Sequence, residues 1–274
     1  MFDTVIEMLS YPFMTRAFLV ESLVALCSAL LGVSLVLKRY SMIGDGLSHV
    51  GFGAMAIAAA MNAAPLTVAI PVVIVAAILL LRISGNAKIK GDAAIALIST
   101  TSLAVGVMVI SLTTGMNTDV YNYMFGSILA MSAEDVKLSL VLSVFVLILF
   151  IVFYHKIFAI TFDETFARAT GVKAGVYNTL IAVLTAVTIV LGMRMMGALL
   201  ISSLIIFPAL TSMRVCRTFK SVIINAAVIS VVCLIAGVTL SYVAATPAGA
   251  SVVLANLVMM VLYTVVGAVK NHMR

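Results

Sequence analysis

The sequence predicts an all-α fold, a polytopic transmembrane helical bundle of about nine spans, with eight as the alternative count. Hydrophobic residues make up 64% of the chain and charged residues only 9%, which leaves too little polar surface for a water-soluble globule. The apolar residues also fall into runs of about 20, the length that crosses the hydrocarbon core of a bilayer as a helix. We therefore treat residues 1–274 as a single transmembrane domain.

Charged residues and clusters of Gly, Pro and Asn separate these runs and mark the ends of the predicted helices. Residues 1–16 mix apolar side chains with a few acids, and we expect them to form an interfacial segment on the outer face. The predicted spans that follow are residues 17–37, 42–61, 65–83, 92–112, 134–154, 177–194, 196–213, 221–243 and 250–268.

Basic residues are distributed unevenly between the two sides of this division. Most of the 16 Lys and Arg residues fall on one side, namely Lys38, Arg39, Arg82, Lys88, Lys90, Lys156, Arg168, Lys173, Arg214, Arg217, Lys220, Lys270 and Arg274. Only Arg16, Lys137 and Arg194 fall on the other. Cytoplasmic loops collect Lys and Arg, so the count predicts an outer N-terminus and a cytoplasmic C-terminus. The net charge of +6 therefore indicates topology, and we expect no nucleic acid as a partner.

One polar stretch interrupts the second predicted span, the hexapeptide Gly-Asp-Gly-Leu-Ser-His of residues 44–49. Asp45 and His49 are four residues apart, so on a helix both side chains project from one face and can share a ligand. Ionisable groups within a membrane segment are functional candidates by default. The structural alternative is that Asp45 caps the helix that follows Lys38 and Arg39, while His49 bonds a neighbouring carbonyl.

Two stretches on the predicted cytoplasmic side are candidates for contact with a partner protein. Residues 155–176 contain an amphipathic turn or two of helix that ends at Gly171, a residue suited to a C-cap. Residues 208–220 form a short basic connection that follows a proline in an apolar run. The alternative is that both stretches serve membrane topology alone.

Several catalytic and redox motifs are absent from the sequence. It contains no Gly-x-x-x-x-Gly-Lys-Ser/Thr loop, so ATP hydrolysis would need a separate chain. No helical pair of zinc-binding histidines with an intervening glutamate occurs, and the three cysteines are too widely spaced for zinc or redox chemistry. We therefore expect a transport subunit rather than an enzyme, with no covalently bound cofactor.

Five motifs follow one another along nearly the whole chain, at residues 42–49, 123–129, 162–171, 197–208 and 246–250. The ordered set resembles the integral-membrane permeases of the bacterial zinc and manganese uptake ABC transporter family. The resemblance implies a permease like those of type II ABC importers, placed in the bacterial cytoplasmic membrane. It also implies several partners: a second permease copy, cytoplasmic ATP-binding subunits, an extracellular metal-binding protein and the membrane lipid.

The resemblance assigns roles to particular residues. Asp45 and His49 match the intramembrane metal contacts of the family, and a carboxylate with an imidazole suits Zn²⁺ or Mn²⁺. A second copy would supply the same pair and so give four protein ligands, and we expect the glycines at positions 44, 46, 51 and 53 to admit the close helix approach that this requires. The implied ATPase-coupling surface consists of Arg214, Cys216, Arg217, Phe219, Phe162 and Arg168.

The sequence thus predicts the permease subunit of an ATP-driven importer that passes a divalent metal from an extracellular binding protein to the cytoplasm. Zinc is favoured over manganese because residues 219–221 and 246–248 look more like those of zinc-transporting members. Two alternatives stay open. One is a proton-coupled secondary metal transporter with Asp45 and His49 as its relay, and the other is an ABC importer of a chelated metal or corrinoid.

Overall fold

The computed structural model is a bundle of α-helices, and it describes residues 12–84, 91–113 and 132–272. Within these ranges it contains no β-strand. The helices are α2 (Pro12–Leu37), α3 (Ile43–Ala60), α4 (Pro65–Ser84), α5 (Gly91–Thr113), α7 (Ala133–Val152), α8 (Tyr154–Phe162), α9 (Glu164–Ala169), α10 (Ala174–Met213), α11 (Phe219–Ala244) and α12 (Ala248–His272). Eight helices of this described part are long and apolar enough to cross a membrane, which confirms the predicted polytopic bundle.

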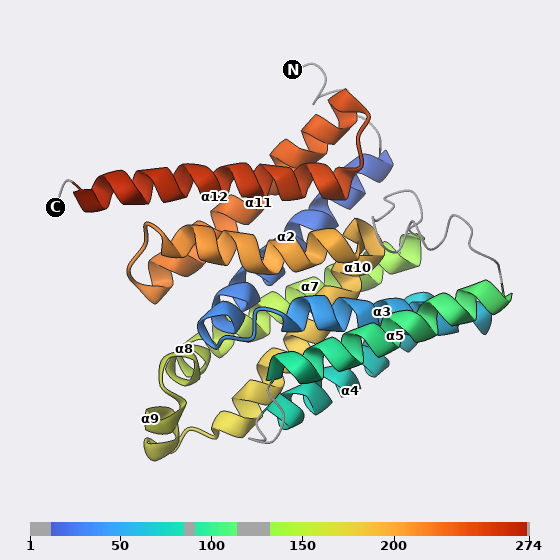
Figure 1. The fold of residues 1–274 in the computed structure, drawn as a ribbon, viewed down its shortest axis with the longest axis horizontal. Helices are drawn as coiled ribbons and strands as arrows, with labels where there is room; N and C mark the ends of the chain where they lie inside the picture. The colour runs from blue at the N-terminus through green and yellow to red at the C-terminus, as the bar shows by residue number, and fades with distance from the viewer. Residues whose placement is uncertain (1–11, 85–90, 114–131, 273–274) are drawn as a thin grey trace.

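α10 is a helical hairpin rather than one rod. Its helix is interrupted at Gly197, whose backbone has φ +83° and ψ +162°. A Cβ atom on Gly192 would collide with the side chain of Ile201, although in a continuous helix these residues lie about 13 Å apart along the axis. Figure 1 shows α10 leaving α9 and then returning toward the end of the bundle where α11 begins. α10 therefore supplies two of the nine predicted spans, one on each side of Gly197.

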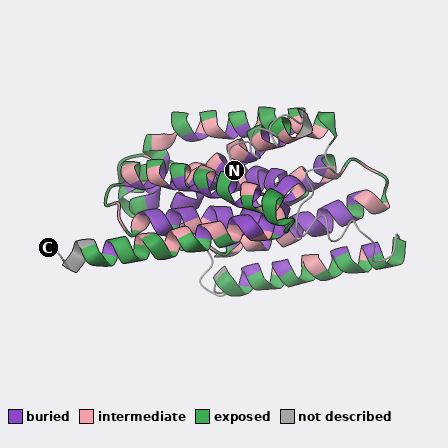
Figure 2. Cartoon of the chain, turned by 90° about the horizontal axis from the view of Figure 1, so that it is seen from above, coloured by how far each residue is buried: buried purple, intermediate pink, exposed green. Residues whose placement is uncertain are grey.

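The inner helices of the bundle are α2, α3, α10 and α11, and the outer ones are α4, α5, α7 and α12. In the most apolar stretch of α10, 78% of the residues are buried, against 11% in α12. Figure 2 shows buried residues concentrated in the middle and exposed residues along the outermost helices. The outer helices carry large apolar side chains on their exposed faces, such as Leu254 and Val258 of α12. Such faces suit contact with lipid or with another membrane protein.

The short helix α9 illustrates how local sequence sets helix ends. The carboxylate of Asp163 accepts a hydrogen bond from the backbone N–H of Phe166 and so caps the first turn. After the last turn, Gly171 adopts φ +84°, a left-handed conformation that favours glycine. Its N–H donates to the carbonyl of Arg168, which confirms the predicted glycine C-cap.

The helix ends that carry the predicted cytoplasmic basic residues meet at one end of the bundle, on the left in Figure 1. There Lys38, which follows α2, bonds to α8, α9 and the start of α10. We call this the Lys38 end. At the opposite end, Arg194 of α10 lies 3.9 Å from a carboxylate oxygen of Asp135 on α7.

Some predicted features lie outside the described residues. These are the motif at residues 123–129 and residues 1–11 of the predicted interfacial segment. From Pro12 onward that segment already belongs to α2, so the first helix begins earlier than residue 17. Proline is well tolerated in the first turn of a helix, where its missing N–H has no intrahelical partner to lose.

Candidate metal site

Asp45 and His49 project from the same face of α3, as their spacing predicts. Oδ2 of Asp45 lies 3.8 Å from Nε2 of His49. The side chain of Asp45 is 46% exposed and that of His49 is 23% exposed. Asp45 also stands in the first turn of α3, where free N–H groups and the helix dipole stabilise a carboxylate. The pair is therefore stable on this helix and reachable from outside the chain.

The alternative role of Asp45 as a helix cap does not match the structure. The N-cap residue of α3 is Met42, and no side-chain hydrogen bond closes this described helix end. Instead, Oδ1 of Asp45 lies 3.5 Å from the hydroxyl of Ser202 on α10. The two oxygens of one carboxylate thus face two different neighbours, His49 and Ser202.

The glycines around the pair contact helices of the same chain. A Cβ atom on Gly46 would lie 2.6 Å from a side chain of α5, and one on Gly53 would lie 2.7 Å from the carbonyl oxygen of Ser102, also on α5. Gly44 and Gly51 face α10 in the same way. Small residues let membrane helices approach closely. The prediction that these glycines admit a second copy is therefore wrong, because α5 and α10 already fill that space.

One stripe of α3 stays open between these two neighbours. It contains Asp45 and His49, which lie four residues apart on one face, and Ile57, which lies twelve residues from Asp45 and about 120° further around the helix. Ile57 is 38% exposed, whereas most of the other residues of α3 are buried. Ser202, itself partly exposed, borders the stripe from α10. We call Asp45, His49 and Ile57 the open stripe of α3.

The pair lacks further ligands of its own kind. Among the described residues, no third His, Cys, Asp or Glu joins Asp45 and His49 to form a metal-binding group. Zinc sites take four ligands and manganese sites commonly take six. Within the described part of one chain, the two side chains are thus an incomplete site with an open side.

The predicted ATPase-coupling residues lie at the Lys38 end, and aromatic contacts bring their two stretches together. The ring of Phe219, at the start of α11, lies 5.1 Å from that of Phe158 and 5.8 Å from that of Phe162, both on α8. Phe162 is 60% exposed, whereas Phe219 is only 6% exposed. Phe219 therefore supports this surface from beneath and does not itself form it.

The other predicted coupling residues reach the surface to different degrees. Arg214 and Arg217 are exposed and Cys216 is half-buried in the connection between α10 and α11. Arg168 is exposed on α9, where its guanidinium lies 2.6 Å from the carboxylate of Glu164.

The predicted loop at residues 208–220 is shorter than expected. α10 continues to Met213 and α11 begins at Phe219, so Pro208 lies inside a helix. Pro208 is buried, and neighbouring helices can stabilise the backbone that a proline leaves unpaired in an apolar bundle. The true connection is residues 214–218.

Lys38 links the surface of α9 to the helix that carries the candidate site. Its Nζ donates to Oδ1 of Asn178 at 2.7 Å, to the carbonyl of Ile160 at 3.1 Å and to Oε2 of Glu164 at 3.3 Å. The residue opens the turn from α2 into α3. The sequence identified Lys38 only as one of the basic residues that predict membrane orientation, because its partners lie more than 100 residues away along the chain.

The charged groups in this network shift one another's pKa values. Burial lowers the pKa of Lys38, and the nearby carboxylate of Glu164 opposes that effect. Burial alone would raise the pKa of Glu164, but hydrogen bonds from Asn178 and Arg168 and the charge of Lys38 outweigh it and lower the pKa. The network therefore favours the charged form of Glu164.

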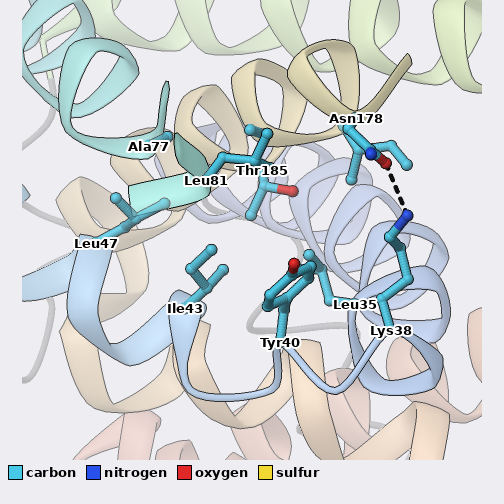
Figure 3. A pocket seen from close by; sticks show the side chains of 11 residues that line it. Leu35, Lys38, Tyr40, Ile43, Leu47, Ala77, Leu81, Asn178 and Thr185 are labelled. Carbon is cyan, nitrogen blue, oxygen red and sulfur yellow. Dashed lines mark hydrogen bonds between the residues drawn. The ribbon is translucent and has the colours of Figure 1, made fainter. Parts of the chain in front are cut away.

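A small cavity lies beside this network. Figure 3 shows Lys38 and its bond to Asn178 at one side of it, with Ile43 and Leu47 of α3 at the other. Each of these two α3 residues precedes a member of the candidate pair by two positions, about 200° around the helix. The cavity therefore faces away from Asp45 and His49 and is separate from the candidate metal site.

A polytopic helical bundle with a pair of ionisable side chains on one of its inner helices is typical of membrane transport proteins. Residues 10–267 match the ABC 3 transport family, and the chain belongs to that family. It is thus a multi-pass membrane permease of ABC transporters.

Several relatives share most of this chain. The high-affinity zinc uptake system membrane protein ZnuB of Haemophilus influenzae is 30% identical over 90% of this chain and 94% of its own. The manganese transport system membrane protein MntC of Halalkalibacterium halodurans is 28% identical over 90% of this chain and 85% of its own. A solved structure, PsaBC from Streptococcus pneumoniae in complex with Fab, is 27% identical with a TM-score of 0.86, over 96% of this chain and 95% of the matched chain.

Proposed function

We propose that this chain is the transmembrane permease subunit of an ATP-driven importer of a divalent metal ion, zinc or manganese. The observation that carries the proposal is the Asp45–His49 pair on the open stripe of α3, in a chain that belongs to the ABC 3 transport family. Relatives named as zinc and manganese transport proteins support the same substrate class. An extracellular binding protein delivers the metal, and separate cytoplasmic subunits hydrolyse ATP.

The protein acts as a pair of permeases in the bacterial cytoplasmic membrane. Two copies that meet along the open stripe of α3 bring together two carboxylates and two imidazoles, which complete a four-ligand site. The exposure of Asp45 and the absence of a third ligand group among the described residues support this arrangement. The Lys and Arg asymmetry supports an outer N-terminus and a cytoplasmic C-terminus.

ATP-driven switching reaches the metal site from the Lys38 end. The exposed residues of α8, α9 and the 214–218 connection contact the ATP-binding subunits. Lys38 bonds to α8, α9 and α10 and leads into α3, so a shift of α9 moves the start of the metal-bearing helix. The site then opens toward the cytoplasm and releases the metal.

The test replaces both ligands and measures transport. Asp45→Ala combined with His49→Ala is expected to abolish zinc and manganese uptake, in cells that have no other importer of either metal. Two matched control variants, Asp92→Ala in the first turn of α5 and His155→Ala on α8, remove the same residue types from exposed positions and should retain uptake.

Three outcomes contradict the proposal. Undiminished uptake by the double variant would refute the role of Asp45 and His49 as metal ligands. Uptake that needs the proton gradient but no ATP-binding subunit would favour the secondary transporter. Transport of a metal chelate without binding of the bare ion would favour the chelate importer.

A further inference from the structure

Ser202 is a polar residue that the proposed site does not yet use. It lies on the second arm of α10, and its Oγ is 3.5 Å from Oδ1 of Asp45. The two residues are 157 positions apart in the sequence, and the break at Gly197 returns this arm toward α3. Ser202 is the side chain through which α10 contacts the carboxylate of the candidate pair.

The hydroxyl of Ser202 has two acceptors within reach. It lies 3.0 Å from the carbonyl of Ala198, in its own helix, and 3.5 Å from Asp45. A hydroxyl carries a single proton, so the two acceptors compete for it. A charged carboxylate is a stronger acceptor than a neutral carbonyl, and rotation about the Cβ–Oγ bond turns the proton toward Asp45.

The two carboxylate oxygens of Asp45 have different neighbours. Oδ1 faces Ser202, whereas Oδ2 faces Nε2 of His49 at 3.8 Å. A hydroxyl that donates to one oxygen of a ligating carboxylate orients that carboxylate, as outer partners do in metal sites. Asp45 thus presents one oxygen, Oδ2, on the side of His49.

We propose that Ser202 is a positioning residue that makes Asp45 a one-oxygen ligand and thereby favours zinc over manganese. This inference rests on the proposed function. With one oxygen from Asp45 and one nitrogen from His49, two copies supply four donors, the number that tetrahedral Zn²⁺ prefers. Mn²⁺ prefers six, mostly oxygen, donors and would gain from a carboxylate that binds through both oxygens.

The experiment compares zinc and manganese uptake in competition, with the full transporter in intact cells. Ser202→Ala removes this partner of Oδ1 and is expected to lower zinc uptake by about tenfold, the lower range for loss of an outer partner, while manganese uptake falls less, so that the preference for zinc declines. Ser203→Ala is the matched control. Ser203 is the adjacent residue, is buried and donates to the carbonyl of Leu200, so its removal should leave the preference unchanged.

A second pair of variants separates the hydroxyl from the shape of the side chain. Ser202→Thr and Ser202→Val have the same shape, and only the threonine keeps a hydroxyl. Ser202→Thr should retain the zinc preference and Ser202→Val should lose it. This pair keeps the test decisive if Ser202→Ala fails to reach the membrane.

The outcomes distinguish this inference from the proposed function. If uptake depends on Asp45 but the metal preference is the same in all Ser202 variants, the role of Ser202 is refuted and the importer stands. A preference that also changes in Ser203→Ala would indicate a general disturbance of α10 and refute it as well. Uptake that persists without Asp45 and His49 would overturn the proposed function itself.

Discussion

Asp45 and Lys38 show how differently single charged residues can be stabilised in an apolar bundle. The ammonium group of Lys38 has three acceptors for its three protons, and its side chain is only 10% exposed. Asp45 has only long contacts with His49 and Ser202 and stays half-exposed. A buried charge is tolerated only when its hydrogen bonds are made. Lys38 therefore holds helices together, whereas Asp45 is available to a ligand.

Replacing Lys38 should loosen α9 from the bundle. In Lys38→Met, Asn178 and Glu164 lose a shared partner, and we expect a loss of roughly 1–3 kcal/mol in the free energy of unfolding. Thermal unfolding of the purified permease measures this loss. The control is Lys173→Met, which removes an exposed lysine at the start of α10 and should leave the unfolding temperature unchanged. Equal unfolding temperatures for both variants would contradict this role of Lys38.

The attachment of α9 should also depend on pH. The pKa of Glu164 is lowered in the folded chain from its usual 4.5, so its contribution to stability is fully present above pH 4.5. It is lost as the pH falls through the lower, folded value. Protease cleavage within α9 should therefore accelerate only in this acid range. The Glu164→Gln variant should show no such step, and a step of equal size in that variant would exclude Glu164 as the titrating group.

At the scale of elements, α10 organises the site through its break. Its first arm contributes Asn178 to the Lys38 network, and its second arm contributes Ser202 to the contact with Asp45. A single straight helix would carry residues 202 and 178 about 36 Å apart along its axis and could not return to α3. The backbone at Gly197 thus determines which residues of α10 reach the candidate site.

Substitution of Gly197 should disturb both the fold and transport. The φ of +83° with ψ of +162° is a region that only glycine occupies readily, so Gly197→Ala should cost roughly 1–3 kcal/mol in stability. We expect a lower unfolding temperature and reduced metal uptake. Gly175→Ala is the control, because a Cβ there, in the same helix, meets no atom within 4 Å. A Gly197→Ala protein as stable as the control would show that the break tolerates a side chain.

At the scale of the whole molecule, buried and exposed helices divide the chain by role. The inner helices α3 and α10 make the polar contact at the candidate site, and Lys38, just after α2, bonds to α8, α9 and α10. The outer helices expose most of their residues, as Figure 2 shows, and large apolar side chains such as Leu254 and Val258 are among them. α3 lies inside the bundle, and its open stripe carries the partly exposed side chains of Asp45 and His49. The proposed pair of copies would meet along that stripe.

Disulfide cross-linking tests the assembly. Ile57→Cys places a thiol on the open stripe of α3, and residues next to a two-fold axis meet their own copy, so we expect a cross-linked dimer under oxidation. Val141→Cys, on the exposed face of α7, is the control and should stay monomeric on a denaturing gel. Cys216 is replaced by serine in both variants, because the other native cysteines are buried. A cross-link in the control alone would place the interface on α7 instead.

The sequence by itself determined the class of fold, the approximate extent of most helices and the shared face of Asp45 and His49. These are local properties, since the length of an apolar run, a capping residue and a four-residue spacing act within a few turns of helix. Only the tertiary structure decided that the glycines of α3 pack against other helices of the same chain and that Phe219 is buried. It also decided that Lys38 bonds to Asn178 and that Ser202 lies beside Asp45. The contacts of Lys38 and Ser202 join residues more than 100 positions apart, and those of the glycines and Phe219 join separate helices, so no local pattern encodes them. The contact of Ser202 also depends on how α10 folds back at Gly197.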